Sequence, residues 1–320
     1  MRTRTSLQCC RCSREGKVNR CQKCKSAQHE HEARICDYPD NVRSGFVTFV
    51  GRPNVGKSTL LNAICGKKVS IVSNKPQTTR TRVRGIHHSP EGQIVFVDTP
   101  GLHKPVTALG ERVNATALDS VNDVEVVCLL IDATKPFGKG DQWVADRIDI
   151  ANAFVVVNKT DKASKEQLLS QLNAVSVLNA AEYFPVSAKT GDGVPQLLAA
   201  LMAKMPEGPA YYPEEMVSDT EEAMWVAELV REQLLAVLKD ELPYSVATRI
   251  TEWEWPRVRC EILVERESQK GMVIGKGGEL LKTVGTNVRA QMPPGAYIEL
   301  HVVVDKDWQQ RPDRLERLGY

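Results

Sequence analysis

The sequence lacks any hydrophobic run long enough to cross a bilayer, and it begins without the apolar block of a secretory signal peptide. A transmembrane helix needs about 18 or more consecutive apolar residues, so we expect neither a membrane-spanning nor a secreted protein. Internal repeats and low-complexity tracts are also missing, which excludes a fibrous protein. The 320 residues are 42% hydrophobic and 26% charged, as in globular proteins, and their number favours two domains over one.

The chain has little excess charge of either sign, because its formal net charge is +2. Taken alone, this value indicates no special partner. The charges are unevenly spread, however, with 10 Lys and Arg against 5 Asp and Glu in residues 1–45, and 3 against 11 in residues 214–255. Six of the nine cysteines lie in the first of these segments. The others, Cys65, Cys128 and Cys260, lie in apolar stretches and are expected to be buried thiols of a reducing compartment.

Short apolar runs begin at Phe46 and are separated by helix-length segments. Strands that alternate with helices predict parallel βαβ units, so we expect an α/β domain with a doubly wound, mostly parallel sheet. Prolines and a glycine then crowd into residues 206–213, as in a linker. We divide the chain into a Cys-rich basic extension (1–44), a first domain (45–205), a linker (206–217) and a second domain (218–320). The expected strands are 46–50, 94–97, 126–131, 154–157 and one that ends at Val186, and expected helices include 57–65 and 165–179.

The second domain is expected to be a small α+β domain. Ser218 and Glu221 have the spacing of a helix-capping box, and apolar residues keep helical spacing from there to Leu238. Two β-rich stretches follow, and then two helical stretches joined by a Gly-rich turn precede a last strand. The predicted order is therefore α-β-β-α-α-β. Its strands are expected at 246–255, 258–265 and 296–304, and its last helix is expected to end at Met292.

The segment from Gly51 to Ser58 reads GRPNVGKS and fits the phosphate-binding pattern G-x-x-x-x-G-K-[ST]. Its glycines let the backbone wrap around phosphates, and N–H groups at the start of the following helix point at the anion. Lys57 is expected to reach the β- and γ-phosphates, and Ser58 to ligate Mg²⁺. Because a strand precedes the loop and a helix follows it, we favour a nucleotide site over an ordinary Gly-rich turn.

Two further segments supply groups for the same site. Asp98 and Gly101 belong to the sequence DTPG at the end of an apolar run, where a carboxylate can hold Mg²⁺ through water and an N–H can meet a γ-phosphate. Between the two motifs lies KPQTTR, whose threonine hydroxyl can complete the Mg²⁺ shell when a γ-phosphate holds the loop. Spacing alone does not choose between Thr78 and Thr79.

The sequence NKTD, from Asn158 to Asp161, ends a further strand and is expected to select guanine. The carboxylate of Asp161 can accept from the N1–H and 2-amino groups of guanine, whereas adenine presents an acceptor at N1 and no 2-amino group. ATP is then rejected through unpaired polar groups. Asn158 is expected to brace the loops near the base, and Lys159 to lie along the ring. The SAK segment at 187–189 can offer a backbone N–H to guanine O6.

The turn Gly275-Lys276-Gly277-Gly278 lies between two helical stretches of the second domain. A G-x-x-G turn of this kind lets the backbone approach nucleic-acid phosphates and clamps about four nucleotides. Lys276 adds a cation, and Lys270 is a nearby basic residue. We therefore interpret the turn as an RNA-binding element rather than a plain helix–turn–helix link. The basic residues expected to supplement it are Arg257, Arg259, Arg266, Lys282 and Arg289.

These motifs resemble one family in both domains. The resemblance rests on GRPNVGKSTLLNA, PQTTR, DTPGLHKP, NKTD and PVSAKTG, and on GPAYYPEE, ELPYSV, VERESQKGMVIGKGGELLKTVG and DWQQRP. Together they are similar to the bacterial Era GTPases, in which a P-loop GTPase domain precedes a type II KH domain. The resemblance spans residues 45–320, and the related Der and MnmE families have other domain layouts.

The resemblance also implies roles for single residues. Thr79, directly before an Arg, is the implied switch residue, and Leu102 stands where Ras-like proteins carry a catalytic Gln, which implies slow intrinsic hydrolysis. Asn54 matches an Asn linked to K⁺-assisted hydrolysis in some relatives, so K⁺ is a candidate beside GTP or GDP and Mg²⁺. We expect Lys57, Thr79 and Gly101 to act in hydrolysis, and Ser58, Thr79 and Asp98 to surround Mg²⁺. The expected nucleotide contacts are Gly51, Asn54, Val55, Gly56, Lys57, Ser58, Thr59, Asp98, Gly101, Asn158, Lys159, Asp161, Ser187, Ala188 and Lys189.

The implied function is a GTP-hydrolysing switch that binds 16S rRNA near its 3′ end during assembly of the 30S subunit. The family resemblance further implies a cytoplasmic protein associated peripherally with the inner face of the cell membrane, and we expect a monomer. The alternative is an RNA-binding chaperone in which GTP turnover is incidental, which the missing Gln at Leu102 keeps open. A GTPase that modifies tRNA would need redox or one-carbon chemistry, for which the sequence offers no residues.

The second domain departs from the family pattern at its last helix. Only residues 290–295 separate Arg289 from the last strand, and two prolines among them are expected to stop the helix early. The turn Glu254-Trp255-Pro256-Arg257 between the first two strands is also tight. The acidic stretch from Glu214 to Glu254 is either a solvated face or a surface that repels RNA and confines it to the G-x-x-G turn. The second hypothesis rests on Glu221, Glu222, Glu228 and Glu232.

The first 44 residues contain two C-x-x-C pairs, Cys9 with Cys12 and Cys21 with Cys24. Four thiolates in this spacing are typical of a structural Zn²⁺ site, with His29, His31 and Cys36 as further candidates. The segment has almost no apolar residues, so the metal would supply most of its folding energy. Two other interpretations stay open, a disordered basic tail and an upstream stretch wrongly read as coding sequence.

Overall fold

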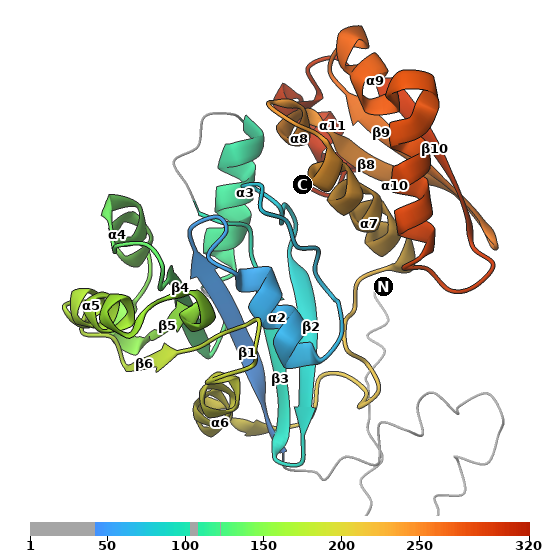
Figure 1. Cartoon of the computed structure of the whole chain (residues 1–320). Coiled ribbons are helices and arrows are strands. Elements are labelled where there is room, and N and C mark those ends of the chain that lie inside the picture. Colours follow the sequence, from blue (N-terminus) through green and yellow to red (C-terminus); the bar gives the residue numbers. More distant parts are fainter. Residues whose placement is uncertain (1–41, 103–107, 122) are drawn as a thin grey trace, which may run out of the picture. The chain divides into compact units, whose positions relative to one another are not determined.

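The computed structural model describes residues 42–102, 108–121 and 123–320 (Figure 1). The four cysteines that are candidates for binding Zn²⁺ lie outside these described residues. Within them, no group of three or more His, Cys, Asp and Glu side chains is arranged to hold a metal ion. No helix within the same ranges is both long and apolar enough to cross a membrane. Cys128 and Cys260 are buried free thiols, and Cys65 is a half-buried one.

A seven-stranded sheet forms the centre of the first domain. Its strands are β1 (Val42–Gly51), β2 (Val83–Ser89), β3 (Gly92–Asp98), β4 (Val126–Asp132), β5 (Phe154–Asn158), β6 (Glu182–Pro185) and β7 (Glu207–Gly208). They are ordered β2-β3-β1-β4-β5-β6, and β7 pairs with β1 (Figure 1). The pairs β1–β3, β1–β4, β4–β5 and β5–β6 are parallel, which confirms the predicted mostly parallel sheet. β2 and β7 are antiparallel to their partners.

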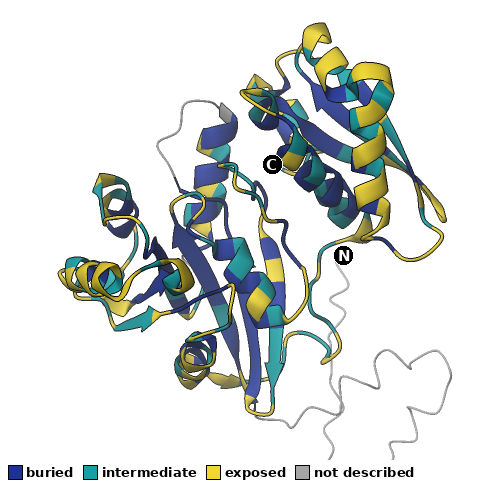
Figure 2. Ribbon diagram, in the orientation of Figure 1, coloured by how far each residue is buried: buried dark blue, intermediate teal, exposed yellow. Residues whose placement is uncertain are grey.

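Helices cover both faces of this sheet, and β3 and β5 are buried throughout (Figure 2). The helices are α2 (Lys57–Cys65), α3 (Ala108–Asp119), α4 (Lys139–Ala145), α5 (Lys165–Ser176) and α6 (Val194–Lys204). On one face, α2 and α6 pack against β1 and β3 with side chains such as Leu60 and Leu197. On the other face, α3, α4 and α5 contribute Ala117, Val144 and Val175. This two-sided burial explains why the strands are continuous apolar runs rather than alternating ones.

The sequence pattern located five of the seven strands and missed β2 and β7, the second of which lies in the predicted linker. The strand β2 reads VRGIHHS, so its apolar pattern is broken, but it pairs with β3 along its whole length. The predicted helix 57–65 is α2, and Gly66 ends it with a φ of +64°, the left-handed conformation that favours glycine. The helix expected at 165–179 ends at Ser176. The domain boundary was placed at residue 45, whereas β1 begins at Val42.

The second domain is a three-stranded sheet with three helices packed on one face, and its Ala247 and Leu263 cluster separately with Trp308 and Leu315. Its elements are α7 (Glu222–Val237), α8 (Leu242–Ser245), β8 (Ala247–Glu254), β9 (Arg257–Val264), α9 (Glu267–Ile274), α10 (Glu279–Arg289), β10 (Tyr297–Val304) and α11 (Pro312–Arg317). The order β10-β9-β8 has β9 antiparallel to β8 and parallel to β10. Val258, Cys260 and Ile262 of β9 pack against Val230 of α7 and Val284 of α10. The predicted α-β-β-α-α-β order is confirmed, with α8 and α11 as short additions.

Two expectations for this domain were wrong. The capping box of Ser218 and Glu221 does not form, because α7 begins at Glu222 and Ser218 instead bonds the hydroxyl and N–H of Thr220. Arg257 and Arg259 do not supplement the G-x-x-G turn. Their neighbours in β9 alternate into the helix-covered core, so both arginines lie on the other face of the sheet, where both pair with Glu299.

The segment between the domains is bonded to the first domain rather than free. Gln93, which is fully buried, accepts from the N–H groups of Tyr211 and Tyr212 at 2.9 and 3.1 Å and donates to Tyr212 O at 2.8 Å. The N–H of Ile86 in β2 donates to Val217 O at 2.9 Å. The connection is therefore fastened along β2 and β3 almost to the start of α7.

Candidate functional site

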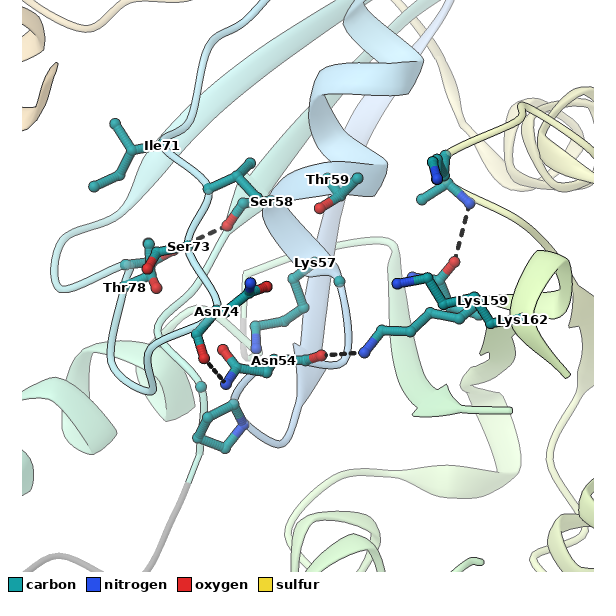
Figure 3. Close-up of a pocket in the computed structure, with 18 of the residues that line it drawn as sticks. Asn54, Lys57, Ser58, Thr59, Ile71, Ser73, Asn74, Thr78, Lys159 and Lys162 are labelled. Atoms are coloured by element: carbon teal, nitrogen blue, oxygen red, sulfur yellow. Dashed lines mark hydrogen bonds between the residues drawn. The ribbon is translucent and has the colours of Figure 1, made fainter. Parts of the chain in front are cut away.

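A cavity of about 390 Å³ opens where β1, β3 and β5 end (Figure 3). Parallel strands that end at one edge bring their following loops together, which is where open α/β sheets bind ligands. Here the loops come from the phosphate-binding motif, the segment after α2, the DTPG motif, and the NKTD and SAK motifs. The lining includes Asn54, Gly56, Lys57, Ser58, Thr59, Thr79, Gly101, Asn158, Lys159, Asp161, Ala188 and Lys189.

Lys57 lies at the start of α2 with its side chain buried against the loop it follows. Its Nζ donates to Gly51 O at 3.2 Å and to Arg52 O at 3.3 Å. Burial lowers the pKa of Lys57 to about 8, although the nearby carboxylate of Asp98 opposes the shift. A buried ammonium held by two carbonyls is suited to receive an anion, because a phosphate offers more negative charge than the carbonyl dipoles.

Ser58, Thr79 and Asp98 come together beside Lys57, although they lie in three separate segments. Ser58 Oγ donates to Asp98 Oδ2 at 2.7 Å and lies 3.0 Å from Thr79 Oγ1. Thr79 Oγ1 is itself 3.4 Å from Asp98 Oδ2. The hydroxyl of Thr78 instead donates to Lys75 O at 2.7 Å. The structure therefore brings Thr79, and not Thr78, to the expected Mg²⁺ ligands.

The residues around Asp98 fit a bound cation. Asp98 is fully buried, and burial raises its pKa against the opposing effects of Lys57 and three hydroxyl groups. Its Oδ2 accepts all three hydroxyl bonds, whereas within the described part of the chain no group donates to the buried Oδ1. Buried carboxylate oxygens are nearly always paired, and one carboxylate with two hydroxyls is an oxygen donor set of the kind that Mg²⁺ prefers.

Asn158 joins two loops of the site. Its Nδ2 donates to Val55 O at 2.9 Å, and its Oδ1 accepts from the N–H of Ala188 at 3.0 Å. Gly56 packs directly against this amide, with a φ of +101° and room for no Cβ, since one would lie 2.3 Å from Asn158 Nδ2. Asn158 thus connects the phosphate-binding loop to the SAK segment, as the sequence predicted.

Asp161 stands exposed at the rim of the cavity. Ser187 Oγ donates to its Oδ1 at 2.8 Å and so orients the carboxylate. Lys159 Nζ donates to Asn54 O at 2.6 Å (Figure 3) and to Asp132 Oδ2 at 2.7 Å, whereas its expected place along the base ring stays a prediction. Burial alone would raise the pKa of Asp132, but hydrogen bonds from Lys159 and Thr134 outweigh it and lower that pKa.

Three further predicted residues lie close to the phosphate-binding loop. Asn54 has a φ of +64°, and its Nδ2 donates to Asn74 O at 2.8 Å, which links the loop to the segment after α2 (Figure 3). Gly101 lies so near Pro53 that a Cβ would come within 2.9 Å of that backbone. Leu102 is buried in the apolar cluster between the sheet and α3, and its side chain does not line the cavity.

The G-x-x-G turn lies between α9 and α10. Gly275, Gly277 and Gly278 all have positive φ, at +76°, +61° and +79°. A Cβ on Gly275 would lie 2.7 Å from Leu280 Cβ, whereas positions 277 and 278 face open space within 4 Å. Lys276 is exposed, and Lys270 lies 4.0 Å from Glu267. The tip of the turn thus presents bare backbone beside a cation.

Sequence reasoning missed two polar residues of the nucleotide site, Ser70 and Asp132. Ser70 is buried and donates to Asp98 Oδ2 at 2.9 Å, and Asn62 holds the backbone at this position by three hydrogen bonds. No spacing rule points to Ser70, because it lies in an irregular segment. Asp132, by contrast, ends β4 just as Asp98 ends β3, so the strand-end pattern could have identified it.

The chain matches two protein-family models, "50S ribosome-binding GTPase" at residues 46–159 and "KH domain" at residues 241–309. It is 48% identical over 296 residues to GTPase Era of Mycobacterium bovis, a match that covers 87% of this chain and 98% of that protein. GTPase Era of Heliobacterium modesticaldum is 44% identical over 293 residues, which cover 88% and 98% of the two chains. This chain belongs to the Era GTPase family.

Solved structures of Era proteins have the same fold. Aquifex aeolicus Era Y63A bound to GDP·AlF₄⁻ gives a TM-score of 0.82 at 35% identity, over 87% of this chain and 99% of that one. A structure of Era with MgGDPNP and nucleotides 1506–1542 of 16S ribosomal RNA gives 0.83, with the same identity and coverage. As an Era-family protein, the chain is a GTPase with a C-terminal KH domain, and the chaperone alternative is not favoured.

Proposed function

We propose that this chain hydrolyses GTP as a switch that governs binding of its KH domain to the 3′ end of 16S rRNA. The observation that supports it most directly is the meeting of Ser58, Thr79 and Asp98 beside Lys57. When bound there, Mg²⁺ supplies positive charge that stabilises the phosphates during transfer. Lys57 would give up its carbonyl contacts to bind the phosphates, and the Gly101 N–H would meet the γ-phosphate.

The base would be selected by Asp161, which Ser187 already orients. In the SAK segment, the N–H of Ser187 bonds Asp192 O and that of Ala188 bonds Asn158 Oδ1. Guanine O6 would therefore receive its hydrogen bond from the N–H of Lys189. Gly51, Asn54, Val55, Gly56 and Thr59 would surround the phosphates, and Asn158 and Lys159 would hold the loops around the base.

Hydrolysis would be slow without a partner, because the position of Leu102 puts no side chain into the cavity to orient water. The K⁺ candidate would act at Asn54. Substituting Na⁺ for K⁺ at constant ionic strength tests this, and equal rates would remove K⁺ from the proposal.

RNA would bind at Gly275, Lys276, Gly277 and Gly278, with Lys270 nearby. The open space over positions 277 and 278 supports close approach of phosphates to the backbone. The related Era that was solved with 16S rRNA nucleotides supports the choice of RNA. A role in assembly of the 30S subunit and a peripheral association with the cytoplasmic face of the membrane follow from the family resemblance and belong to the same proposal.

Single-turnover GTP hydrolysis with and without an oligonucleotide of the 16S rRNA 3′ end tests the switch. We expect this RNA to change the rate constant of hydrolysis, and a scrambled oligonucleotide of equal length to leave it unchanged. RNA that alters nucleotide affinity but never the rate would instead support the chaperone. Crosslinking in cell extract with a non-hydrolysable GTP analogue identifies the bound RNA, and predominant tRNA or mRNA would contradict the rRNA assignment.

A further inference from the structure

The segment that carries Thr79 lacks the backbone hydrogen bonds of regular secondary structure. Residues 69–82, all of them described, form neither helix nor strand. Backbone groups in such a segment must find hydrogen-bond partners elsewhere, because a buried unpaired group is costly. Two of these partners come from the KH domain, Glu232 for the N–H of Val72 and Arg231 for the carbonyl of Thr78. The sequence patterns did not connect this domain to the nucleotide site.

The KH helix α7 contacts the segment at two places. Glu232 Oε1 accepts from the N–H of Val72 at 3.0 Å, and its Oε2 accepts from Lys68 Nζ at 2.5 Å. One residue earlier, Arg231 donates through Nη2 to the carbonyl of Thr78. Two of the four glutamates expected to repel RNA are therefore engaged in ion pairs, Glu228 with Arg231 of the same helix and Glu232 with Lys68.

The surroundings of Arg231 fix the orientation of its side chain. Its side chain is completely buried, and Glu228 holds it with bonds of 2.8 and 2.5 Å. Burial would lower the pKa of Arg231, but the charge and hydrogen bonds of Glu228, with smaller effects of Tyr320 and Glu232, together outweigh burial and raise it. A buried guanidinium fixed by a carboxylate has a defined orientation, so its bond to Thr78 O defines the position of that peptide.

Arg80, on the other side of Thr79, is anchored to the same domain. It donates to Val246 O at 2.8 Å and to Tyr244 O at 3.0 Å, and it is almost fully buried. The rings of Trp308 and Tyr320 lie with centroids 5.8 and 5.7 Å from its guanidinium carbon. Aromatic faces at this distance attract a cation. The residues on both sides of Thr79 are thus tied to the KH domain, Thr78 through its carbonyl and Arg80 through its side chain.

We infer that Arg231 is a positioning residue for the nucleotide site, through which the KH domain holds Thr79 toward Ser58 and Asp98. Arg231 touches neither nucleotide nor metal and acts through the Thr78 carbonyl. The inference rests on the proposed function, together with the expectation that Thr79 completes the Mg²⁺ shell when a γ-phosphate holds its loop. Docking of the KH domain and binding of MgGTP then favour each other by the same factor, because coupling between two sites is reciprocal.

The test uses the full chain with the substitution Arg231→Met, which keeps much of the side-chain volume without the charge. We expect affinity for the non-hydrolysable analogue GppNHp with Mg²⁺ to fall about 5- to 50-fold, whereas GDP affinity changes less than about twofold. The matched control is Arg249→Met, which breaks an equally close ion pair with Glu261 in the same domain but away from residues 69–82. The control is expected to bind both nucleotides like the wild type.

Trypsin gives a readout that does not depend on hydrolysis. Because Arg80 is buried, cleavage after it requires the segment to open. With MgGppNHp bound, Arg231→Met is expected to be cut after Arg80 at least tenfold faster than the wild type, and Arg249→Met at the wild-type rate. Arg231→Lys, which can still donate to Thr78 O, is expected to lie between them. If Arg231→Met does not fold, Glu232→Gln takes its place. We expect this variant to lose affinity for GppNHp and not for GDP, by a smaller factor than Arg231→Met, and equal affinity for GppNHp would overturn the inference.

These experiments distinguish failure of the proposed function from failure of the positioning role of Arg231. A wild-type protein that binds neither guanine nucleotide would overturn the proposed function itself. A wild type that binds both, with Arg231→Met equal to it in GppNHp affinity and in cleavage after Arg80, would overturn the positioning role alone. Equal weakening of GDP and GppNHp would also overturn it, because a general loss of structure affects both nucleotides.

Discussion

At the scale of the residue, the carboxylate of Asp161 is expected to select the base. Replacing Asp161 with Asn is expected to weaken GTP binding by a factor on the order of 10² to 10⁴, because an amide nitrogen would face the two guanine donors. Displacement of a fluorescent GTP analogue measures the loss. Ser187→Ala keeps the carboxylate but removes the hydroxyl that orients it, so its loss is expected to be smaller. Unchanged GTP affinity in Asp161→Asn would mean that guanine is recognised elsewhere.

Asn158 is expected to matter for stability as well as for binding. Its substitution by Ala leaves Val55 O and the Ala188 N–H without their partner, and burial excludes water from the site. We expect the free energy of unfolding to fall by about 2–4 kcal/mol, measured by urea denaturation. Asn152→Ala, an exposed residue bonded only to Asp149 among the described side chains, serves as control and should cost less than about 0.5 kcal/mol. A similar small cost at Asn158 would contradict the bracing role.

Among the elements, the turn between α9 and α10 allows RNA binding to be separated from folding. Gly277→Asp and Gly278→Asp place a side chain in open space, so their structural cost is limited to about 1–2 kcal/mol from the left-handed backbone. The added carboxylate is expected to repel phosphates and reduce RNA affinity at least tenfold, measured by filter binding. Gly271→Ala in α9, which also meets nothing within 4 Å, is the matched control and should bind RNA normally.

Only two of the four glutamates named for the repulsion hypothesis can be used to test it. Because Glu228 and Glu232 are held in ion pairs, their neutralisation would disturb the helix contacts as well as the charge. Glu221 and Glu222 are exposed, and the double change to Gln should raise nonspecific RNA affinity at low salt if the acidic surface repels RNA. Nonspecific affinity equal to that of the wild type at low salt would reject the hypothesis.

At the scale of the whole molecule, the connection between the domains is expected to depend on one buried amide. Gln93→Leu removes three hydrogen bonds to Tyr211 and Tyr212 at similar volume. We expect chymotrypsin to cleave after these tyrosines at least tenfold faster than in the wild type, with the rest of the chain cut at an unchanged rate. Gln142→Leu, which breaks an exposed bond to Asp146, is the control. Wild-type cleavage rates in Gln93→Leu would show that other contacts fasten the linker.

The sequence by itself determined the architecture and most of the nucleotide site. Buried parallel strands require continuous apolar runs, and phosphate-binding loops require small residues at fixed spacing, so both leave local patterns. Such patterns predicted the sheet, α2, the strand-end residues Asp98 and Asn158, and the α-β-β-α-α-β order. They failed at β2, whose histidines and glycine break the pattern, because its place depends on pairing with β3.

Only the tertiary structure decided which residues beyond these motifs meet. Ser70 reaches Asp98, and Thr79 rather than Thr78 faces the same carboxylate, because an irregular segment takes its path from partners distant in sequence. Arg231 lies 153 residues from Thr78, and no spacing rule connects them. The nearly neutral net charge was equally uninformative, since it averages a basic extension with an acidic helix whose central glutamates are engaged in ion pairs. A motif depends on residues that are close in sequence and can therefore be recognised from the sequence. Contacts between distant segments depend on how the whole chain packs, so only the tertiary structure shows them.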